Sequence, residues 1–175
     1  MEDLSNIIIG TGSYETVKRG NTVSVTGDGG HAWGYIGPAY KKLAPRLVTY
    51  EPYAEKLKTL LELKKLLEIK KDITIMKQYQ EYRKQIEDEY IKSYYELRLK
   101  GLDAKELLKT LKEKFGYYII LLCHEPVDEF CHRRLIADYI ELETGIYIPE
   151  ISVDANGTVK KLVPISYKDR LKELM

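Results

Sequence analysis

The stretch that most constrains the fold is a run of six apolar or aromatic residues, 117–122, which ends in Cys123-His124-Glu125. Such a run is typical of a strand buried on both faces, as in a parallel sheet covered by helices. A short turn follows, and then Cys131-His132-Arg133-Arg134 opens a segment with apolar residues at helical spacing. A buried strand followed at once by a helix predicts a layered α/β fold.

The rest of the chain supplies the other elements of such a fold. The pattern predicts strands at 6–10, 22–26, 146–153 and 159–165, and helices at 52–71, 73–99, 103–116, 128–143 and 167–175. Asp72 and Asp103 are expected to cap helices, and Pro149 places the strand 146–153 at a sheet edge. We therefore predict one α/β domain over 1–175, with a largely parallel, Rossmann-like sheet, helices on both faces and a long helical insertion at about 52–102.

Composition excludes several classes of function. The chain has 175 residues, with 28 basic and 27 acidic residues and a net charge of +1, so nucleic acid is an unlikely partner. No apolar run approaches the ~20 residues of a membrane span, and the polar start does not resemble a signal peptide. Two cysteines in such a chain are expected to be reduced thiols, which predicts a cytoplasmic protein.

Three polar loops follow predicted strands and are expected to meet. Ser13 and Tyr14 follow the first strand, Asp28 follows the second, and residues 123–133 follow the central strand. In open α/β sheets, ligands bind in the crevice outside the carboxyl ends of the strands. The sequence therefore predicts a crevice lined by these loops, and Trp33 and Tyr35 in the second loop could stack there on a planar ring.

The Cys-His cluster is compatible with four kinds of chemistry. Cys131 at a helix start could be a thiolate of lowered pKa in an anion site, with Arg133 as the anion clamp. Glu125, His124 or His132 could transfer protons. Zinc is a third interpretation, but two adjacent Cys-His pairs around residues 125–130 strain tetrahedral geometry, so no metal is assigned. The fourth is structural, with both thiols as small core side chains.

These considerations lead to one expected function and one alternative. We expect the domain to bind or act on a small phosphorylated or nucleotide-type anionic ligand, and we assign no cofactor, oligomeric state or definite reaction. The alternative is a non-catalytic module that senses a ligand or docks a protein. The expected catalytic residues are Cys131, His132 and Glu125, and the expected ligand-binding residues are Arg133, Ser13, Tyr14, Asp28 and Cys123.

The segment from Leu122 to Arg133 also resembles a known family. Leu-Cys-His-Glu at 122–125, followed after a spacer by Cys-His-Arg at 131–133, is similar to the signature of the domain of unknown function family 488. Ser13-Tyr14, Leu-Ala-Pro at 43–45, Tyr90, Tyr94 and Glu150 fit the same resemblance. The Leu/Lys-rich helix at 52–71 departs from it and is expected to be an insertion. The resemblance implies the fold and the site, and it implies no activity.

Overall fold

A five-stranded sheet lies at the centre of the protein. The structure is a computed structural model and describes residues 3–175. The strands are β1 (Ile8–Ser13), β2 (Asn21–Ser24), β3 (Ile119–Cys123), β4 (Glu150–Val153) and β5 (Val159–Leu162), in the order β2-β3-β1-β4-β5. Strands β1 to β4 run parallel to one another, and β5 is antiparallel to β4. The predicted α/β class with a largely parallel sheet is confirmed.

Five helices complete the fold: α1 (Leu47–Lys70), α2 (Ile73–Tyr94), α3 (Ala104–Phe115), α4 (His132–Thr144) and α5 (Lys168–Leu174). A short π-helix, Tyr95–Leu99, continues α2. The side chain of Asp72 accepts a hydrogen bond from the backbone N–H of Thr74, and Asp103 accepts from two amides of α3. Both predicted N-caps are confirmed, since each carboxylate satisfies backbone donors that have no partner within the helix.

Two helices begin at residues other than those predicted. Helix α1 starts at Leu47 and contains Pro52, which was expected to mark its start. Because Pro52 has no N–H, it cannot donate to the carbonyl of Val48. Val48 is exposed, so water can donate to that carbonyl instead. Helix α4 starts at His132 instead of near residue 128, because Phe130 is anchored before the helix by ring contacts with Tyr53, Tyr90 and Tyr167.

The prediction that the strand after Gly145 forms a sheet edge is wrong. β4 lies between β1 and β5, and β5 occupies that edge of the sheet. Pro149 comes just before β4, where its carbonyl accepts a hydrogen bond from the backbone N–H of Thr11. The missing N–H of proline therefore does not interrupt the ladder, and the hairpin through residues 154–158 supplies the outer strand.

The two faces of the sheet are covered differently. Side chains of Ile119, Leu121 and Cys123 join residues of α2, α3, α4 and α5 in the larger core cluster. Side chains of Ile120 and Leu122 point to the opposite face. That face packs against Val17, Tyr14 and Tyr35, which come from loops, where a second helical layer had been expected. The sheet is therefore covered by helices on one face and by loops on the other.

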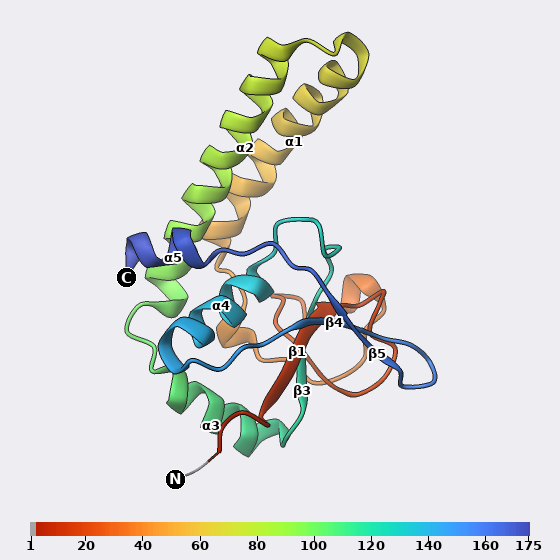
Figure 1. The fold of residues 1–175 in the computed structure, drawn as a ribbon, viewed down its shortest axis with the longest axis vertical. Coiled ribbons are helices and arrows are strands. Elements are labelled where there is room, and N and C mark those ends of the chain that lie inside the picture. The colour runs from red at the N-terminus through yellow and green to blue at the C-terminus, as the bar shows by residue number, and fades with distance from the viewer. Residues whose placement is uncertain (1–2) are drawn as a thin grey trace.

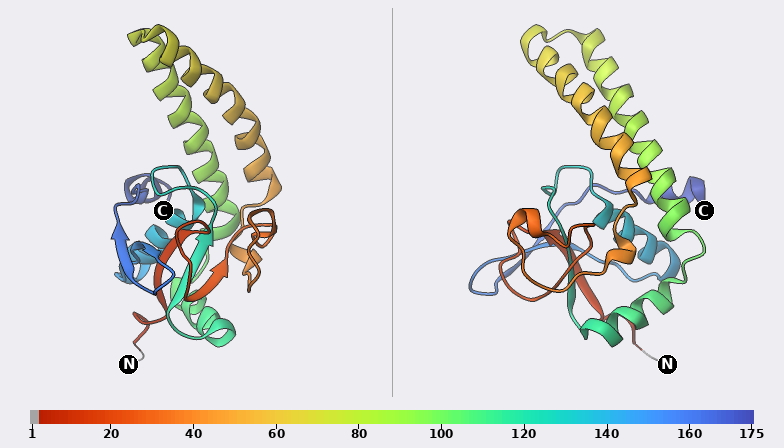
Figure 2. Two further views of the ribbon diagram at one scale, coloured as in Figure 1. Left: turned by 90° about the vertical axis from the view of Figure 1, so that its right-hand side faces the viewer. Right: turned by 180° about the vertical axis from the view of Figure 1, so that it is seen from behind.

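Helices α1 and α2 form an antiparallel hairpin that projects away from the sheet. The three ribbon views agree that the two helices lie side by side and that their connection is the part most distant from the strands (Figures 1 and 2). The base of the hairpin joins the core through Tyr90, Ile91 and Tyr94 of α2 and the partly buried Tyr53 of α1. Among residues 3–175, no helix combines the length and the apolar character needed to cross a membrane.

Candidate functional site

A pocket of about 440 Å³ opens at the carboxyl ends of β2 and β3. One wall comes from the loop after β2, including Thr26, Asp28 and Trp33, and another comes from the start of α1. Tyr50 and Tyr53 belong to this part of α1. The remaining lining includes His124, Glu125, Phe130, Cys131 and His132 from the segment after β3, together with Tyr90 of α2. The predicted meeting of strand-end loops is therefore observed for the second and third loops.

Aromatic rings form much of the pocket. The rings of Trp33 and His124 are stacked, with centroids 5.3 Å apart and planes inclined by 10°. Tyr53 contacts both Tyr90 and Phe130, at centroid distances of 5.2 and 5.3 Å. Flat π faces of this kind accept planar ligands by stacking.

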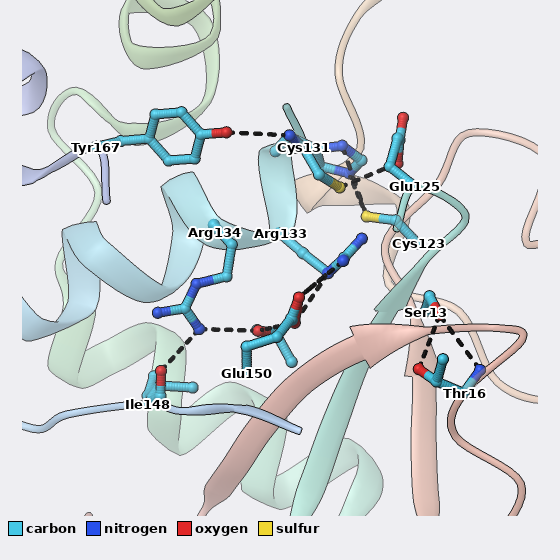
Figure 3. A network of polar contacts seen from close by, with 12 residues as sticks. Ser13, Thr16, Cys123, Glu125, Cys131, Arg133, Arg134, Ile148, Glu150 and Tyr167 are labelled. Carbon is cyan, nitrogen blue, oxygen red and sulfur yellow. Dashed lines mark hydrogen bonds and ion pairs between the residues drawn. The ribbon is translucent and has the colours of Figure 1, made fainter. Parts of the chain in front are cut away.

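Glu125 connects the pocket to the buried cysteine at the start of α4. The Sγ atom of Cys131 donates to Oε2 of Glu125 at 3.0 Å (Figure 3), and Nε2 of His124 lies 3.1 Å from Oε1. Cys131 is only 1% exposed. Burial raises the pKa of the Cys131 thiol well above its ordinary value, and Cys123 and Glu125 raise it further, whereas Arg133 lowers it. Desolvation therefore outweighs any lowering of this pKa by the helix terminus, which argues against the thiolate interpretation.

His132 is held beneath the pocket by two contacts. Its Nε2 lies 2.7 Å from the carbonyl oxygen of Val25, which can only accept, so Nε2 carries the proton. Both ring nitrogens lie 3.7 Å from Sγ of Cys123. The residues after β2 and β3 are thereby joined through a single imidazole.

Arg133 points away from the pocket into a buried ion pair. Its guanidinium donates two hydrogen bonds to Oε2 of Glu150, at 2.8 and 3.1 Å, and one to Oε1 at 3.0 Å. Both side chains are 1% exposed. Thr11 donates to the same carboxylate and accepts from Arg134, whose guanidinium also donates to the carbonyl of Ile148 (Figure 3). This network joins α4 to β1 and β4.

The structure divides the predicted site residues into three groups. Glu125, Cys131, His132 and Asp28 line the pocket, and Cys123 lies behind it in contact with His132. The other three do not line it. Ser13 bonds to Thr16, Tyr14 bonds to Ser24 and Thr26, and Arg133 is paired with Glu150. An anion clamp at Arg133 would require the Glu150 pair to open, so this role stays a prediction.

Asp28 shapes the loop that carries Trp33. Its carboxylate accepts from the backbone N–H groups of Gly30 and Ala32 at 2.8 and 3.1 Å, and from the hydroxyl of Thr26 at 3.0 Å. The two backbone hydrogen bonds lower the pKa of Asp28. The left-handed backbone at Gly29 and Gly30 lets the loop turn within this distance.

Several pocket residues were not assigned to the site from sequence. His124 was considered for proton transfer and as one of the possible zinc ligands. Tyr90 was singled out only through the family resemblance, and Tyr53 and Phe130 were not singled out. No local pattern connects Tyr53 of α1 with Phe130, since their contact depends on how the hairpin sits on the core.

A second cavity of about 450 Å³ adjoins the first and shares Tyr50, Tyr53, His124, Glu125 and Phe130 with it. It is lined by the cations Lys64 and Arg83 and by the further acidic residues Glu87, Asp128 and Glu129. Arg83 is already paired with Glu87 at 2.9 Å. The combined lining is therefore acidic.

The buried floor of the first pocket also contains metal-ligand types. Ligand atoms of Cys123, Cys131 and His132 lie within 4.8 Å of one another. Each of the two cysteines is followed directly by a histidine, but only His132 belongs to this group, because His124 stacks on Trp33. The predicted strain of two Cys-His pairs around one ion therefore does not arise.

Comparison with known proteins identifies the family and nothing closer. No curated protein and no solved structure matches the chain. Residues 42–140, more than half of the 175-residue chain, match the model of the family described as Domain of unknown function DUF488. The matched segment contains both cysteines, Glu125 and His132, and it ends before Glu150. The chain therefore belongs to the DUF488 family, as its Cys-His-Glu and Cys-His-Arg motifs predicted.

Proposed function

We propose that this protein binds a small nucleotide-type ligand in the aromatic pocket and transfers protons to or from it through Glu125. The observation that supports this most strongly is the pocket itself, which combines stacking surfaces with a carboxylate at its floor. Pockets of 300–1,000 Å³ lined by aromatic side chains and a few polar groups are the usual form of small-molecule sites.

The charge of the lining narrows the class of ligand. The charged side chains of the first pocket are Asp28 and Glu125, and neither lysine nor arginine lines it. A phosphate placed there would meet like charge, whereas a neutral heteroaromatic ring can stack and donate hydrogen bonds to a carboxylate. The proposal is therefore a nucleobase or nucleoside, in preference to a phosphate-rich ligand.

Each predicted residue has a defined part in this proposal. Glu125 is the proton-transfer group, and Cys131 and His132 form the floor on which it rests. Asp28 holds the loop of Trp33 in place. Cys123, Ser13, Tyr14 and Arg133 support the pocket from behind and do not contact the ligand.

Tryptophan fluorescence provides the first test, because Trp33 is the only tryptophan of the chain and lines the pocket. We expect saturable quenching when the protein is titrated with at least one of the common nucleobases or nucleosides, and weaker binding of the matching monophosphate. Glu125→Gln should weaken binding about tenfold or more, as expected for loss of a charged hydrogen-bond acceptor.

The matched control is Glu129→Gln. Glu129 is exposed, lies in the same loop and lines only the second cavity. Its replacement should leave the affinity unchanged within twofold. The proposal is contradicted if no ligand of the panel gives saturable quenching, or if the two glutamine variants weaken binding equally.

Burial of both thiols favours a second candidate function, non-catalytic sensing of the same ligand. Cys123 and Cys131 are 0% and 1% exposed, and a buried thiol of raised pKa is a poor nucleophile. In this case the thiols of the native protein should alkylate slowly at neutral pH, and a bound nucleoside should be recovered chemically unchanged. Conversion of the bound nucleoside would instead support the catalytic form of the proposal.

A further inference from the structure

Three side chains that commonly bind metal ions, two cysteines and one histidine, meet at one buried point between β3 and α4. Cys123 is the last residue of β3, whereas Cys131 and His132 stand at the start of α4, on the other side of the loop 124–130. All three are buried, and their ligand atoms lie within 4.8 Å of one another. Two elements of the rigid core therefore hold the ligands, and no flexible segment has to fold around an ion.

The distances match the dimensions of a zinc site. Bonds of about 2.3 Å to sulfur and about 2.0–2.1 Å to nitrogen, arranged tetrahedrally, place a sulfur and a nitrogen ligand about 3.6 Å apart. Sγ of Cys123 and Nδ1 of His132 are 3.7 Å apart, and the ligand atoms of all three residues lie within 4.8 Å of one another. The side chains would therefore have to draw together by roughly 1 Å at most to hold the ion.

The imidazole of His132 has one nitrogen satisfied and one left for a ligand. Nε2 donates to the carbonyl of Val25 at 2.7 Å, so Nδ1 is the nitrogen available to an ion, and the ring must turn to aim it because Sγ of Cys123 lies 3.7 Å from both ring nitrogens. A histidine that ligates a metal almost always donates its other N–H to a carbonyl, a carboxylate or water in this way.

Arg133 supplies a second, independent feature. Its side chain is 1% exposed, and its Nη1 atom is buried without a hydrogen-bond partner. A divalent ion bound to two thiolates carries no net charge from those three groups, so the bound group and the guanidinium would not repel each other. The residue next to His132 is therefore compatible with a bound ion.

From these observations we propose that Cys123, Cys131 and His132 form a three-ligand site for a thiophilic divalent ion of the zinc class. The fourth position faces the aromatic pocket, because Cys131 and His132 both line it. The carboxylate of Glu125 contacts Sγ of Cys131 at 3.0 Å and stands beside that position without belonging to the three-residue group. The inference goes beyond the proposed function, since the ion can bind whether or not the pocket takes a nucleoside.

Cobalt(II) titration of the reduced, metal-free protein tests the site without any variant. We expect one cobalt ion per chain, thiolate-to-cobalt charge-transfer absorption, and visible bands of tetrahedral intensity that zinc abolishes in equimolar amount. Absence of thiolate charge transfer would overturn the proposal. Formation of a Cys123–Cys131 disulfide that tris(2-carboxyethyl)phosphine must open, with no cobalt bound afterwards, would overturn it equally.

Variants identify the ligands. Cys123→Ser and Cys131→Ser should each lower cobalt affinity by 100-fold or more and remove part of the charge-transfer band, and His132→Asn should lower affinity at least tenfold. His124→Asn is the matched control, since His124 is adjacent to Cys123 in sequence but stacks on Trp33. Equal loss of affinity in both histidine variants would contradict the assignment. Circular dichroism verifies that each variant folds. If one variant does not fold, the cobalt absorption spectrum of the wild-type protein still tests the proposal.

The metal site and the nucleoside pocket can fail separately. Trp33 quenching by the nucleoside is measured with the metal-free and the zinc-loaded protein. Cobalt binding without quenching keeps the metal site and contradicts the proposed function, and quenching without cobalt binding does the reverse.

Discussion

Helices α4 and α1 are both rich in leucine or isoleucine, yet they have opposite environments. In α4, nine consecutive residues from His132 to Ile140 are buried, among them two arginines and an aspartate. In α1, 24 residues long, only Thr49 and Leu60 are buried, and Leu66 and Ile69 are 39% and 79% exposed. Burial here follows position relative to the sheet and does not follow hydrophobicity.

The two helices also differ in how their charged side chains are stabilised. Buried charges must be paired, and α4 satisfies this through Arg133 with Glu150 and Arg134 with Asp138. Helix α1 contacts mainly α2, and its charges remain in water, as in the pair between Lys56 and Glu89. An ion pair is therefore a structural requirement in one region and a minor contribution in the other.

The largest expected effect comes from breaking the buried pair. Glu150→Ala leaves the guanidinium of Arg133 buried without its partner and should lower the free energy of unfolding by about 3–5 kcal/mol. Urea unfolding followed by circular dichroism measures the change. Glu89→Ala, which removes the exposed pair with Lys56, should leave the midpoint nearly unchanged, since solvent screens it. Equal shifts in the two variants would contradict the comparison.

A smaller but clear effect is expected from truncating an apolar side chain in each helix. Ile136 in α4 is fully buried, so Ile136→Ala should cost about 2–5 kcal/mol through lost contacts and a cavity. Leu66→Ala in α1 should cost about 1 kcal/mol or less, because the side chain is already partly in water. Thermal or urea denaturation of both variants measures how much unfolding free energy each one loses. A loss above 2 kcal/mol at Leu66 would show that the hairpin is buried in solution.

The smallest effect distinguishes the two capped helices. Asp103→Ala should cost about 1 kcal/mol in global unfolding, because α3 packs on the core. Asp72→Ala removes an equivalent cap at the distant end of the hairpin. There we expect faster hydrogen exchange in the first turn of α2 with little shift of the global midpoint. Equal global shifts would mean that the hairpin and the core unfold together.

Local patterns were sufficient for most of the secondary structure. The caps at Asp72 and Asp103 were predicted, since caps depend on residues within one turn of the helix end. The edge assignment of β4 failed because Pro149 was judged without its partner strands. The start of α4 was misplaced because Phe130 is held by rings from α1, α2 and the segment before α5.

The site was predicted in location more than in detail. Cys131, His132 and Glu125 were placed together because they follow one strand, and they do line one pocket. The direction of Arg133 was not predicted, since its partner Glu150 lies 17 residues further along the chain on another strand. The same holds for His132, which bonds to Val25 at a separation of 107 residues.

The sequence by itself determined the α/β class, the order of the elements, the two aspartate caps and the family, because these depend on periodicity and on residues close together in the chain. Only the tertiary structure decided which leucines are exposed, which charges are buried and which ligand atoms meet. Those outcomes depend on contacts such as Thr11 with Glu150, 139 residues apart. Such contacts form only when the parallel strands are assembled, so no local pattern records them.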